Sequence, residues 1–122
     1  QSGIGRGYYS LSDFNILNQA IIEKLKLFDL SIEIRFCPHK PENKCKCRKP
    51  NIGMVECDQR ADKDIFIGDQ ITDMICAQNA NIKHRWLINK SNSRYATRFA
   101  LDHSIFLSKV KEWYKMDILE IY

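Results

Sequence analysis

The sequence predicts an α/β domain with a mainly parallel sheet and flanking helices. Segments with apolar residues at every third or fourth position, typical of helices, alternate along the chain with short segments typical of strands. One of the short segments, 65–67, is wholly apolar between charged residues, as expected for a central parallel strand buried on both faces. The 122 residues suffice for one domain, which we predict over 1–122.

The first predicted helix follows a glycine-rich segment, 1–9. The glycines stand at alternate positions around Arg6, which predicts a loop whose backbone closely approaches another group. Ser10 and Asp13 then have the spacing of a capping box, so a helix begins there. Its apolar residues recur at a helical spacing and define one buried face. The residues expected on that face are Phe14, Leu17, Ile21, Leu25 and Phe28.

Further elements are expected in order along the chain. Apolar and charged residues alternate over 31–36, which predicts a strand leading into Cys37. The segment 52–62 suits a short helix carrying Met54, Val55 and Cys57. After the strand at 65–67, a helix is expected from Ile71, strands at 85–88 and 98–101, and a helix over 104–115. The buried side of this last helix is expected to hold Phe106, Leu107, Val110, Trp113 and Tyr114. The tail, 117–122, is ambiguous.

Composition excludes several classes of protein. No run approaches the roughly 18 apolar residues of a membrane helix, and no leader segment is visible, so we expect a soluble protein of the cytoplasm. A net charge of +4 is small for a nucleic-acid coat, and no aromatic residues alternate with the lysine cluster to stack on bases. We therefore expect no membrane and no nucleic-acid partner, and a monomer.

The segment 37–50 holds the most informative motif. Cys37-x-His39 and Cys45-x-Cys47 form two ligand pairs joined by five residues. Three thiolates and one imidazole are a typical ligand set of structural zinc, and four protein ligands leave no open position for catalysis. Free surface thiols are the alternative. The two other cysteines, Cys57 and Cys76, are expected to pack as small apolar residues.

Positive charge follows the last cysteine of this loop. Arg48 and Lys49 come directly after Cys47, so a metal that fixes the cysteine also fixes these side chains. A planar guanidinium and a point charge together suit a phosphate dianion. The alternative is a solvated basic loop, which we prefer for Lys40, Lys44 and Lys46.

A second polar motif follows the 65–67 strand. Asp69 comes after Gly68, at the carboxyl end of the strand, where open α/β sheets bind ligands. Asp73 lies one helical turn later. Two carboxylates at this position commonly bind Mg²⁺, although both could instead favour the helix amino terminus through its dipole. His84 and His103 have no partners at ligand spacing and receive no role.

Together these motifs resemble the haloacid dehalogenase superfamily. Cys-Pro-His, Cys-x-Cys-Arg-Lys-Pro and Gly-Asp-x-x-x-Asp-Met are similar to its zinc-bearing branch of heptose-bisphosphate and histidinol-phosphate phosphatases, and the opening QSGIGRGYY is closer to the heptose type. The resemblance covers roughly residues 1–90. It implies a Mg²⁺-dependent phosphoric monoester hydrolase of the cytoplasm, with structural Zn²⁺, acting on D-glycero-D-manno-heptose 1,7-bisphosphate for lipopolysaccharide or other surface heptose.

The resemblance also implies roles for individual residues. Lys49 would neutralise the nucleophile and the transferring phosphoryl group, Arg48 would contact substrate, and Asp69 would bind Mg²⁺ with support from Asp73. The loop 1–9 would lie along the sugar phosphate. Its expected substrate contacts are Gln1, Ser2 and Arg6. The zinc ligands would be Cys37, His39, Cys45 and Cys47.

Two departures from the family pattern affect these expectations. Gln70 follows Asp69, where relatives usually carry a basic residue. Family members also begin with a strand that ends in Asp-x-Asp, the first Asp being the nucleophile, and no strand predicted here ends in that pattern. We therefore expect the chain to be the carboxyl-terminal part of a longer protein, inactive and poorly folded in isolation.

Three other functions stay open at this point. One is a histidinol-phosphate phosphatase, which a panel of substrates would separate from the heptose type. Another is a non-catalytic zinc module that binds nucleic acid or protein through its basic loop. A third is a degenerate phosphatase kept as a scaffold. The preferred anomer at C1 of the sugar is not encoded in any motif.

Overall fold

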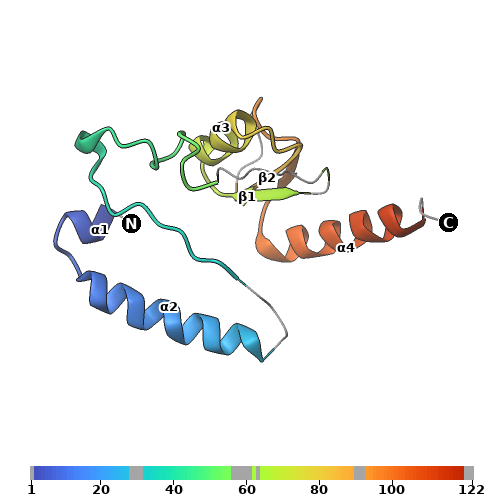
Figure 1. The fold of residues 1–122 in the computed structure, drawn as a ribbon. Helices are drawn as coiled ribbons and strands as arrows, with labels where there is room; N and C mark the ends of the chain where they lie inside the picture. The colour runs from blue at the N-terminus through green and yellow to red at the C-terminus, as the bar shows by residue number, and fades with distance from the viewer. Residues whose placement is uncertain (1, 28–31, 56–61, 63, 90–92, 120–122) are drawn as a thin grey trace. The chain divides into compact units, whose positions relative to one another are not determined.

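The computed structural model describes residues 2–27, 32–55, 62, 64–89 and 93–119 (Figure 1). The chain forms two compact parts, Gln1–Arg48 and Lys49–Tyr122, each with its own architecture. The expectation of one domain over 1–122 stays a prediction. None of the described helices is both long enough and apolar enough to cross a membrane.

Two helices and a long loop make up the first part. Helix α1, Ser2–Gly5, is a single turn within the segment expected to be a loop. Helix α2, Leu11–Lys26, begins at the predicted capping box. The Ser10 hydroxyl accepts a hydrogen bond from the Asp13 amide at 3.0 Å, and the Asp13 carboxylate accepts one from the Ser10 amide at 3.0 Å. These bonds satisfy two of the amides that a helix start leaves unpaired.

The predicted buried face of α2 is largely wrong. Phe14 is buried and its ring lies 4.5 Å from that of Phe36, centre to centre. Leu17 and Ile21, however, are 59% and 41% exposed, because none of the described elements of the first part covers them. Phe28 lies outside the described residues.

The strand predicted over 31–36 does not form in the described residues of this segment, 32–36, which are extended but paired with no other strand. A strand needs a neighbour for its amides and carbonyls, and alternation of side chains alone does not supply one. A short 3₁₀ turn, Pro41–Asn43, follows within the cysteine loop.

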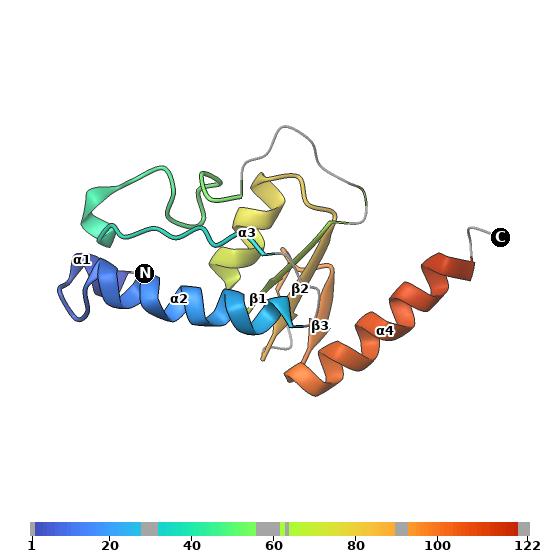
Figure 2. The same ribbon diagram turned by 60° about the horizontal axis from the view of Figure 1, so that its bottom comes forward.

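Three parallel strands form the centre of the second part. They are β1 (Ile65–Gly68), β2 (His84–Ile88) and β3 (Arg98–Ala100), in that order across the sheet. Figure 2 shows them side by side. Ile65 pairs with His84, and Trp86 with Arg98, in the parallel register. The predicted α/β class with a parallel sheet and flanking helices is confirmed.

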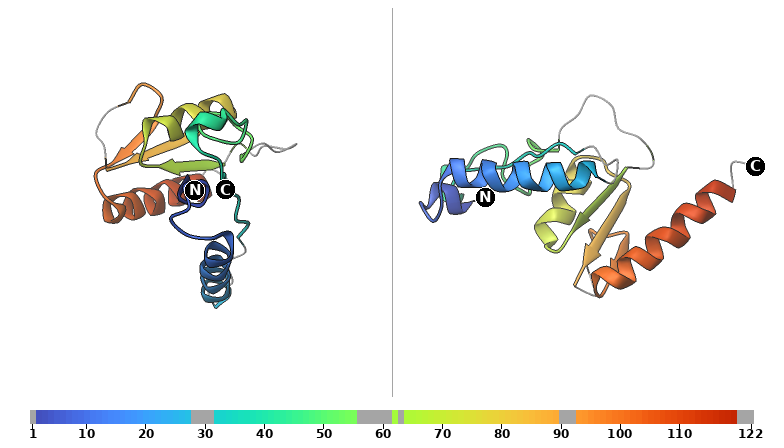
Figure 3. Two further views of the ribbon diagram at one scale, coloured as in Figure 1. Left: turned by 90° about the vertical axis from the view of Figure 1, so that its left-hand side faces the viewer. Right: turned by 90° about the horizontal axis from the view of Figure 1, so that it is seen from below.

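Helices cover both faces of this sheet. Helix α3, Ile71–Asn79, contacts β1 and β2, and helix α4, His103–Leu119, contacts β3 (Figure 3). Neighbouring side chains of β2 point to opposite faces, so Trp86 packs with Phe106 of α4 while buried Leu87 lies on the other face. The Trp86 and Phe106 rings meet edge to face at 5.2 Å.

Several details of the second part differ from the predictions. Within the described sheet β1 is an edge strand rather than a strand buried on both faces, and Ile67 is 48% exposed. Residues 53–55 form a turn where a helix was expected, closed by a bond from the Val55 amide to the Ile52 carbonyl; Cys57 lies outside the described residues. On α4, Phe106 is buried as predicted but Leu107 is 56% exposed. The side chains of Trp113 and Tyr114 lie outside the described part.

Candidate functional site

The predicted ligand loop assembles all four of its ligand atoms. One ligand atom each from Cys37, His39, Cys45 and Cys47 lies within 4.8 Å of every other. The three sulfur atoms are 3.3 to 3.4 Å apart, and Nδ1 of His39 lies 3.5 Å from Cys37 Sγ. A tetrahedral zinc at about 2.3 Å from each sulfur separates sulfurs by about 3.8 Å, so small outward shifts would admit a metal.

The thiols in this cluster share their protons unequally. Burial acts to raise the pKa of Cys45, but hydrogen bonds from Cys47, from Cys37 and from backbone amides outweigh it and lower the pKa to about 6. The hydrogen bonds that Cys47 makes with Cys37 and Cys45 raise its own pKa to about 11. One thiol of the cluster is therefore poised as a thiolate, the form that binds metal.

The glycine-rich segment lies against the cysteine loop within the first part. A Cβ atom on Gly5 would come within 2.5 Å of the Pro38 carbonyl oxygen, so only glycine fits there. Gly7 has a φ of +77°, in the left-handed region that favours glycine. The predicted close approach of this segment to another group is confirmed, and the group is the Pro38 backbone in the cysteine loop.

The second polar cluster surrounds the carboxyl end of β1. Asp73, in the first turn of α3, is buried at 2% exposure and turns back toward the strand. One of its oxygens, Oδ2, accepts hydrogen bonds from the amides of Asp69 at 3.2 Å and Gln70 at 3.0 Å. Gly68 makes room for this carboxylate, because a Cβ atom there would lie 2.4 Å from Asp73 Cβ.

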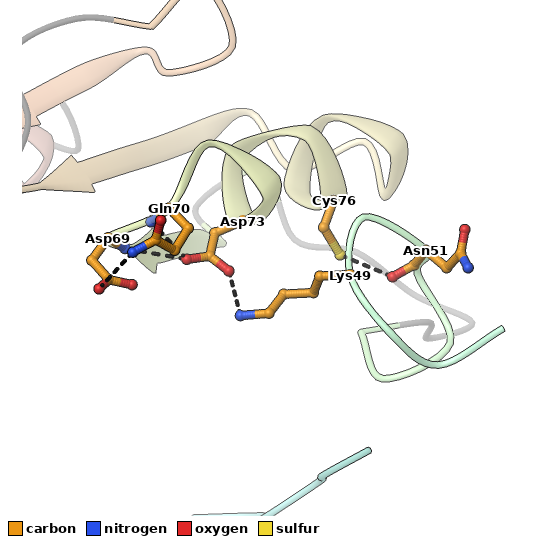
Figure 4. Close-up of polar contacts among 6 residues, drawn as sticks. All are labelled: Lys49, Asn51, Asp69, Gln70, Asp73 and Cys76. Atoms are coloured by element: carbon orange, nitrogen blue, oxygen red, sulfur yellow. Dashed lines mark hydrogen bonds and ion pairs between the residues drawn. The ribbon is translucent and has the colours of Figure 1, made fainter. Parts of the chain in front are cut away.

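Lys49 forms an ion pair with the other oxygen of Asp73 (Figure 4). The lysine is partly exposed, with 42% of its side chain accessible, so its ammonium group can meet both the buried carboxylate and a ligand from solvent. Behind this pair, the Cys76 thiol donates to the Asn51 carbonyl at 3.2 Å, and burial raises its pKa. Asp73 accepts from the Asp69 amide and also pairs with Lys49, so Lys49 lies close to the turn that contains Asp69.

Asp69 itself is exposed. Its Oδ2 accepts a hydrogen bond from the Gln70 side chain at 3.2 Å, while its amide is held by Asp73. Of the two carboxylates predicted to bind Mg²⁺, Asp69 thus faces solvent, whereas Asp73 is occupied by two amides and a lysine. The geometry fits a cation on Asp69 with Asp73 as its support.

The remaining predicted substrate contacts lie in the first part of the chain. Ser2 begins α1, Arg6 is exposed in the turn after it, and Arg48 is half-buried directly after Cys47. Gln1 lies outside the described residues.

Sequence reasoning missed two residues at the carboxyl ends of the strands. Asn89, just after β2, and His103, at the start of α4, line a cavity of about 280 Å³ together with Asp69. The signal for Asn89 was its position one residue past an apolar strand, equivalent to that of Asp69. No spacing in the sequence could connect His103 to either.

One Asp-x-Asp sequence does occur, at Asp62-Lys63-Asp64, and sequence reasoning passed over it. Asp62 and Asp64 precede β1 instead of ending a strand, so they lie at the opposite end of β1 from Asp69. Asp62 is exposed and pairs with Lys83 at 2.6 Å. Its position argues for a surface ion pair and against a nucleophile.

Comparisons with known proteins bear on this geometry. No family model matches the chain. The D-glycero-beta-D-manno-heptose-1,7-bisphosphate 7-phosphatase of Helicobacter pylori is 39% identical over 95 residues, which are 72% of this chain and 55% of that protein. The D-glycero-alpha-D-manno-heptose-1,7-bisphosphate 7-phosphatase of Campylobacter jejuni is 41% identical over 96 residues, 74% of this chain and 55% of that protein. The chain is similar to heptose-bisphosphate phosphatases.

The resemblance predicted from the motifs is thereby confirmed. The histidine biosynthesis bifunctional protein HisB of Blochmanniella floridana is also similar, with 34% identity over 89 residues, 68% of this chain and 25% of that protein. The chain spans about half the length of the heptose-bisphosphate phosphatases that it matches.

Proposed function

We propose that the protein is a Mg²⁺-dependent phosphatase that removes the 7-phosphate of D-glycero-D-manno-heptose 1,7-bisphosphate. The observation that carries this proposal is the group at the end of β1: a partly exposed lysine held by a buried carboxylate, next to an exposed carboxylate. Relatives named as heptose-bisphosphate 7-phosphatases support the substrate class. Their names contain both anomers, so either anomer fits the proposal.

In this proposal the chain's residues bind and orient the phosphoryl group. Lys49 donates to a phosphoryl oxygen and offsets its charge, while Asp73 fixes the lysine in place. Asp69 holds Mg²⁺, which when bound neutralises further charge on the phosphoryl oxygens. Arg48 contacts the substrate as a planar fork, and the loop 1–9, with Gln1, Ser2 and Arg6, lies along the sugar phosphate.

In this proposal the nucleophile is an aspartate that is not part of the group at the end of β1. Its carboxylate attacks phosphorus and the bond from phosphorus to the sugar oxygen breaks, with that oxygen taking a proton from solvent. Water then hydrolyses the aspartyl phosphate to inorganic phosphate and the free carboxylate. Support comes from the charges of Lys49, Asp69 and Asp73 and from the positions of Asp62 and Asp64, which are at the wrong end of β1 for this role.

The cysteine cluster has a structural role in the proposal. Cys37, His39, Cys45 and Cys47 hold Zn²⁺, which shapes the loop that leads into Arg48 and Lys49. The closed set of four ligands supports a structural metal over a catalytic one. We also propose that the protein is a cytoplasmic monomer without nucleic-acid or membrane partners. It would supply heptose for lipopolysaccharide or other surface polymers, and the heptose in the relatives' names supports this metabolic role.

Similarity to HisB favours a second candidate, histidinol-phosphate phosphatase. Release of inorganic phosphate by the protein expressed from its complete gene separates the two. We expect release from the heptose bisphosphate with a kcat/KM at least about tenfold above that for histidinol phosphate. The reverse ratio would establish the second candidate. Release from neither, with salt-dependent binding of nucleic acid, would favour a non-catalytic zinc module.

A further inference from the structure

A cavity lies at the carboxyl ends of β1 and β2. Its volume is about 280 Å³, near the lower end of the range for small-ligand pockets and large enough for one monosaccharide. Parallel α/β sheets bind their ligands at this edge. The residues that line it are Ile67, Gly68, Asp69, Ile88, Asn89 and His103.

The lining carries both apolar surface and hydrogen-bonding groups. Ile67 and Ile88 contribute the apolar part. The Asn89 amide and the His103 imidazole can each donate and accept, and the Asp69 carboxylate accepts. A sugar presents the same combination, since its C–H faces are apolar and each hydroxyl both donates and accepts.

Charge in the lining argues against phosphate as the occupant. None of the described residues that line the cavity is a lysine or arginine, and the Asp69 carboxylate without a bound cation would repel an anion. The cationic groups available to phosphate lie elsewhere, and Lys49 is on the Asp73 side of Asp69. Asp69 thus lies between the cationic group of Lys49 and a polar cavity whose described lining holds no lysine or arginine.

Backbone geometry fixes the two newly assigned residues. Asn89 has a φ of 64°, a conformation that asparagine tolerates better than most residues. Its backbone N–H donates to the Ala100 carbonyl at 2.9 Å. His103 begins α4, whose first turn is capped by Asp102 accepting from the Ile105 amide at 2.8 Å. Both side chains are therefore carried by backbone that is already held in place.

We propose that this cavity binds the hydroxyl-bearing carbons of the sugar, with Asn89 and His103 as specificity-determining residues. The inference rests on the proposed function and deepens it. The phosphoryl group lies on the Lys49 side of Asp69, and the polyol enters the cavity. Selectivity for a sugar phosphate over other phosphate esters then comes from hydrogen bonds that a substrate without hydroxyls cannot make.

Asn89→Gly tests this assignment with little risk to the fold, because glycine adopts a positive φ freely and keeps the backbone bond to Ala100. Asn81→Gly is the matched control: Asn81 is also exposed, has a φ of 58°, and lies before β2 at the opposite end of the strand. The protein is expressed from its complete gene and assayed on heptose bisphosphate and on p-nitrophenyl phosphate, which has no polyol.

We expect Asn89→Gly to raise KM for the heptose bisphosphate roughly fivefold to thirtyfold, the loss of one or two hydrogen bonds. This rise in KM should be at least about fivefold larger than the rise in KM for p-nitrophenyl phosphate. His103→Gln should also raise KM for the heptose bisphosphate. Asn81→Gly should leave KM for both substrates unchanged. An equal loss on both substrates, or an Asn89→Gly enzyme indistinguishable from Asn81→Gly, would overturn the assignment.

A binding measurement separates failure of this inference from failure of the proposed function. If the parent protein hydrolyses neither ester, saturation-transfer NMR with free D-glycero-D-manno-heptose still reports on the cavity. We expect transfer to the neutral sugar in the parent protein, a clear reduction in Asn89→Gly, and no competition by inorganic phosphate. Absence of transfer in the parent, or full competition by phosphate, would contradict the inference.

Discussion

The two polar clusters of this chain are built in different ways. The cysteine cluster draws all its ligands from residues 37–47, a loop without sheet structure. The cluster at the end of β1 joins Lys49 to Asp69 and Asp73 and depends on the sheet, on α3 and on the space left by Gly68. Local spacing is enough to assemble the first, whereas the second exists only where tertiary structure brings distant residues together.

Removing one cysteine ligand should have the largest effect. Cys45→Ser leaves three ligands, and we expect zinc content to fall from about one ion per chain to nearly none after dialysis, because structural zinc needs its full set. Metal analysis by mass spectrometry measures this. Cys76→Ser is the control, since this buried thiol lies outside the cluster. Equal zinc in the parent protein and Cys45→Ser would refute the metal assignment.

A methyl group at Gly68 should disrupt the second cluster. The added Cβ would overlap Asp73 Cβ at 2.4 Å, so Gly68→Ala should lower the free energy of unfolding by about 3 kcal/mol. Urea unfolding provides the measurement. Gly7→Ala is the comparison, because no atom lies within 4 Å and only its positive φ opposes the substitution. A smaller loss at Gly68 than at Gly7 would contradict the close packing of Asp73 against Gly68.

Neutralising Asp73 should have a smaller effect. Asp73→Asn keeps one acceptor for the amides but removes the charge opposite Lys49, and we expect a loss of about 2 kcal/mol. This is less than for a fully buried pair, because the lysine is partly exposed. Asp62→Asn, in the exposed pair with Lys83, should leave stability unchanged. Similar losses in both variants, measured by urea unfolding, would be evidence against a specific role for Asp73.

The smallest effect belongs to the amino terminus of α2. Hydrogen bonds from the side chain and backbone of Ser10 hold the pKa of Asp13 below its ordinary value. A lowered folded-state pKa stabilises the protein above the unfolded value, about 4, and this contribution disappears as the pH falls through the folded value. The Tm difference between the parent and Asp13→Asn should therefore shrink in acid. A constant difference would contradict the capping role.

Features that depend on neighbouring residues were predictable from the sequence. The capping box at Ser10, the clustering of Cys37, His39, Cys45 and Cys47, and the strand-Gly-Asp turn at 65–69 all follow from short spacings. Features that depend on a distant partner were not. The alternating segment 32–36 has the composition of a strand but pairs with no other strand among the described residues, and β1 has the composition of a central strand but lies at an edge of the described sheet.

The candidate site shows the same division. Lys49, Asp69 and Asp73 were proposed from motifs, but the motifs could not show that Asp73 faces Lys49 rather than solvent. Asn89 and His103 belong to no motif. They became visible only because two parallel strands end side by side and α4 begins beside them.

The most direct test of the central claim compares two aspartates at opposite ends of β1. Asp69→Asn and Asp62→Asn make the same chemical change in exposed residues, in protein expressed from the complete gene. We predict that Asp69→Asn lowers kcat/KM for the heptose bisphosphate by at least about a hundredfold, while Asp62→Asn stays within about twofold of the parent. Equal activity of the two variants would contradict the assignment of the β1 carboxyl end as the catalytic site.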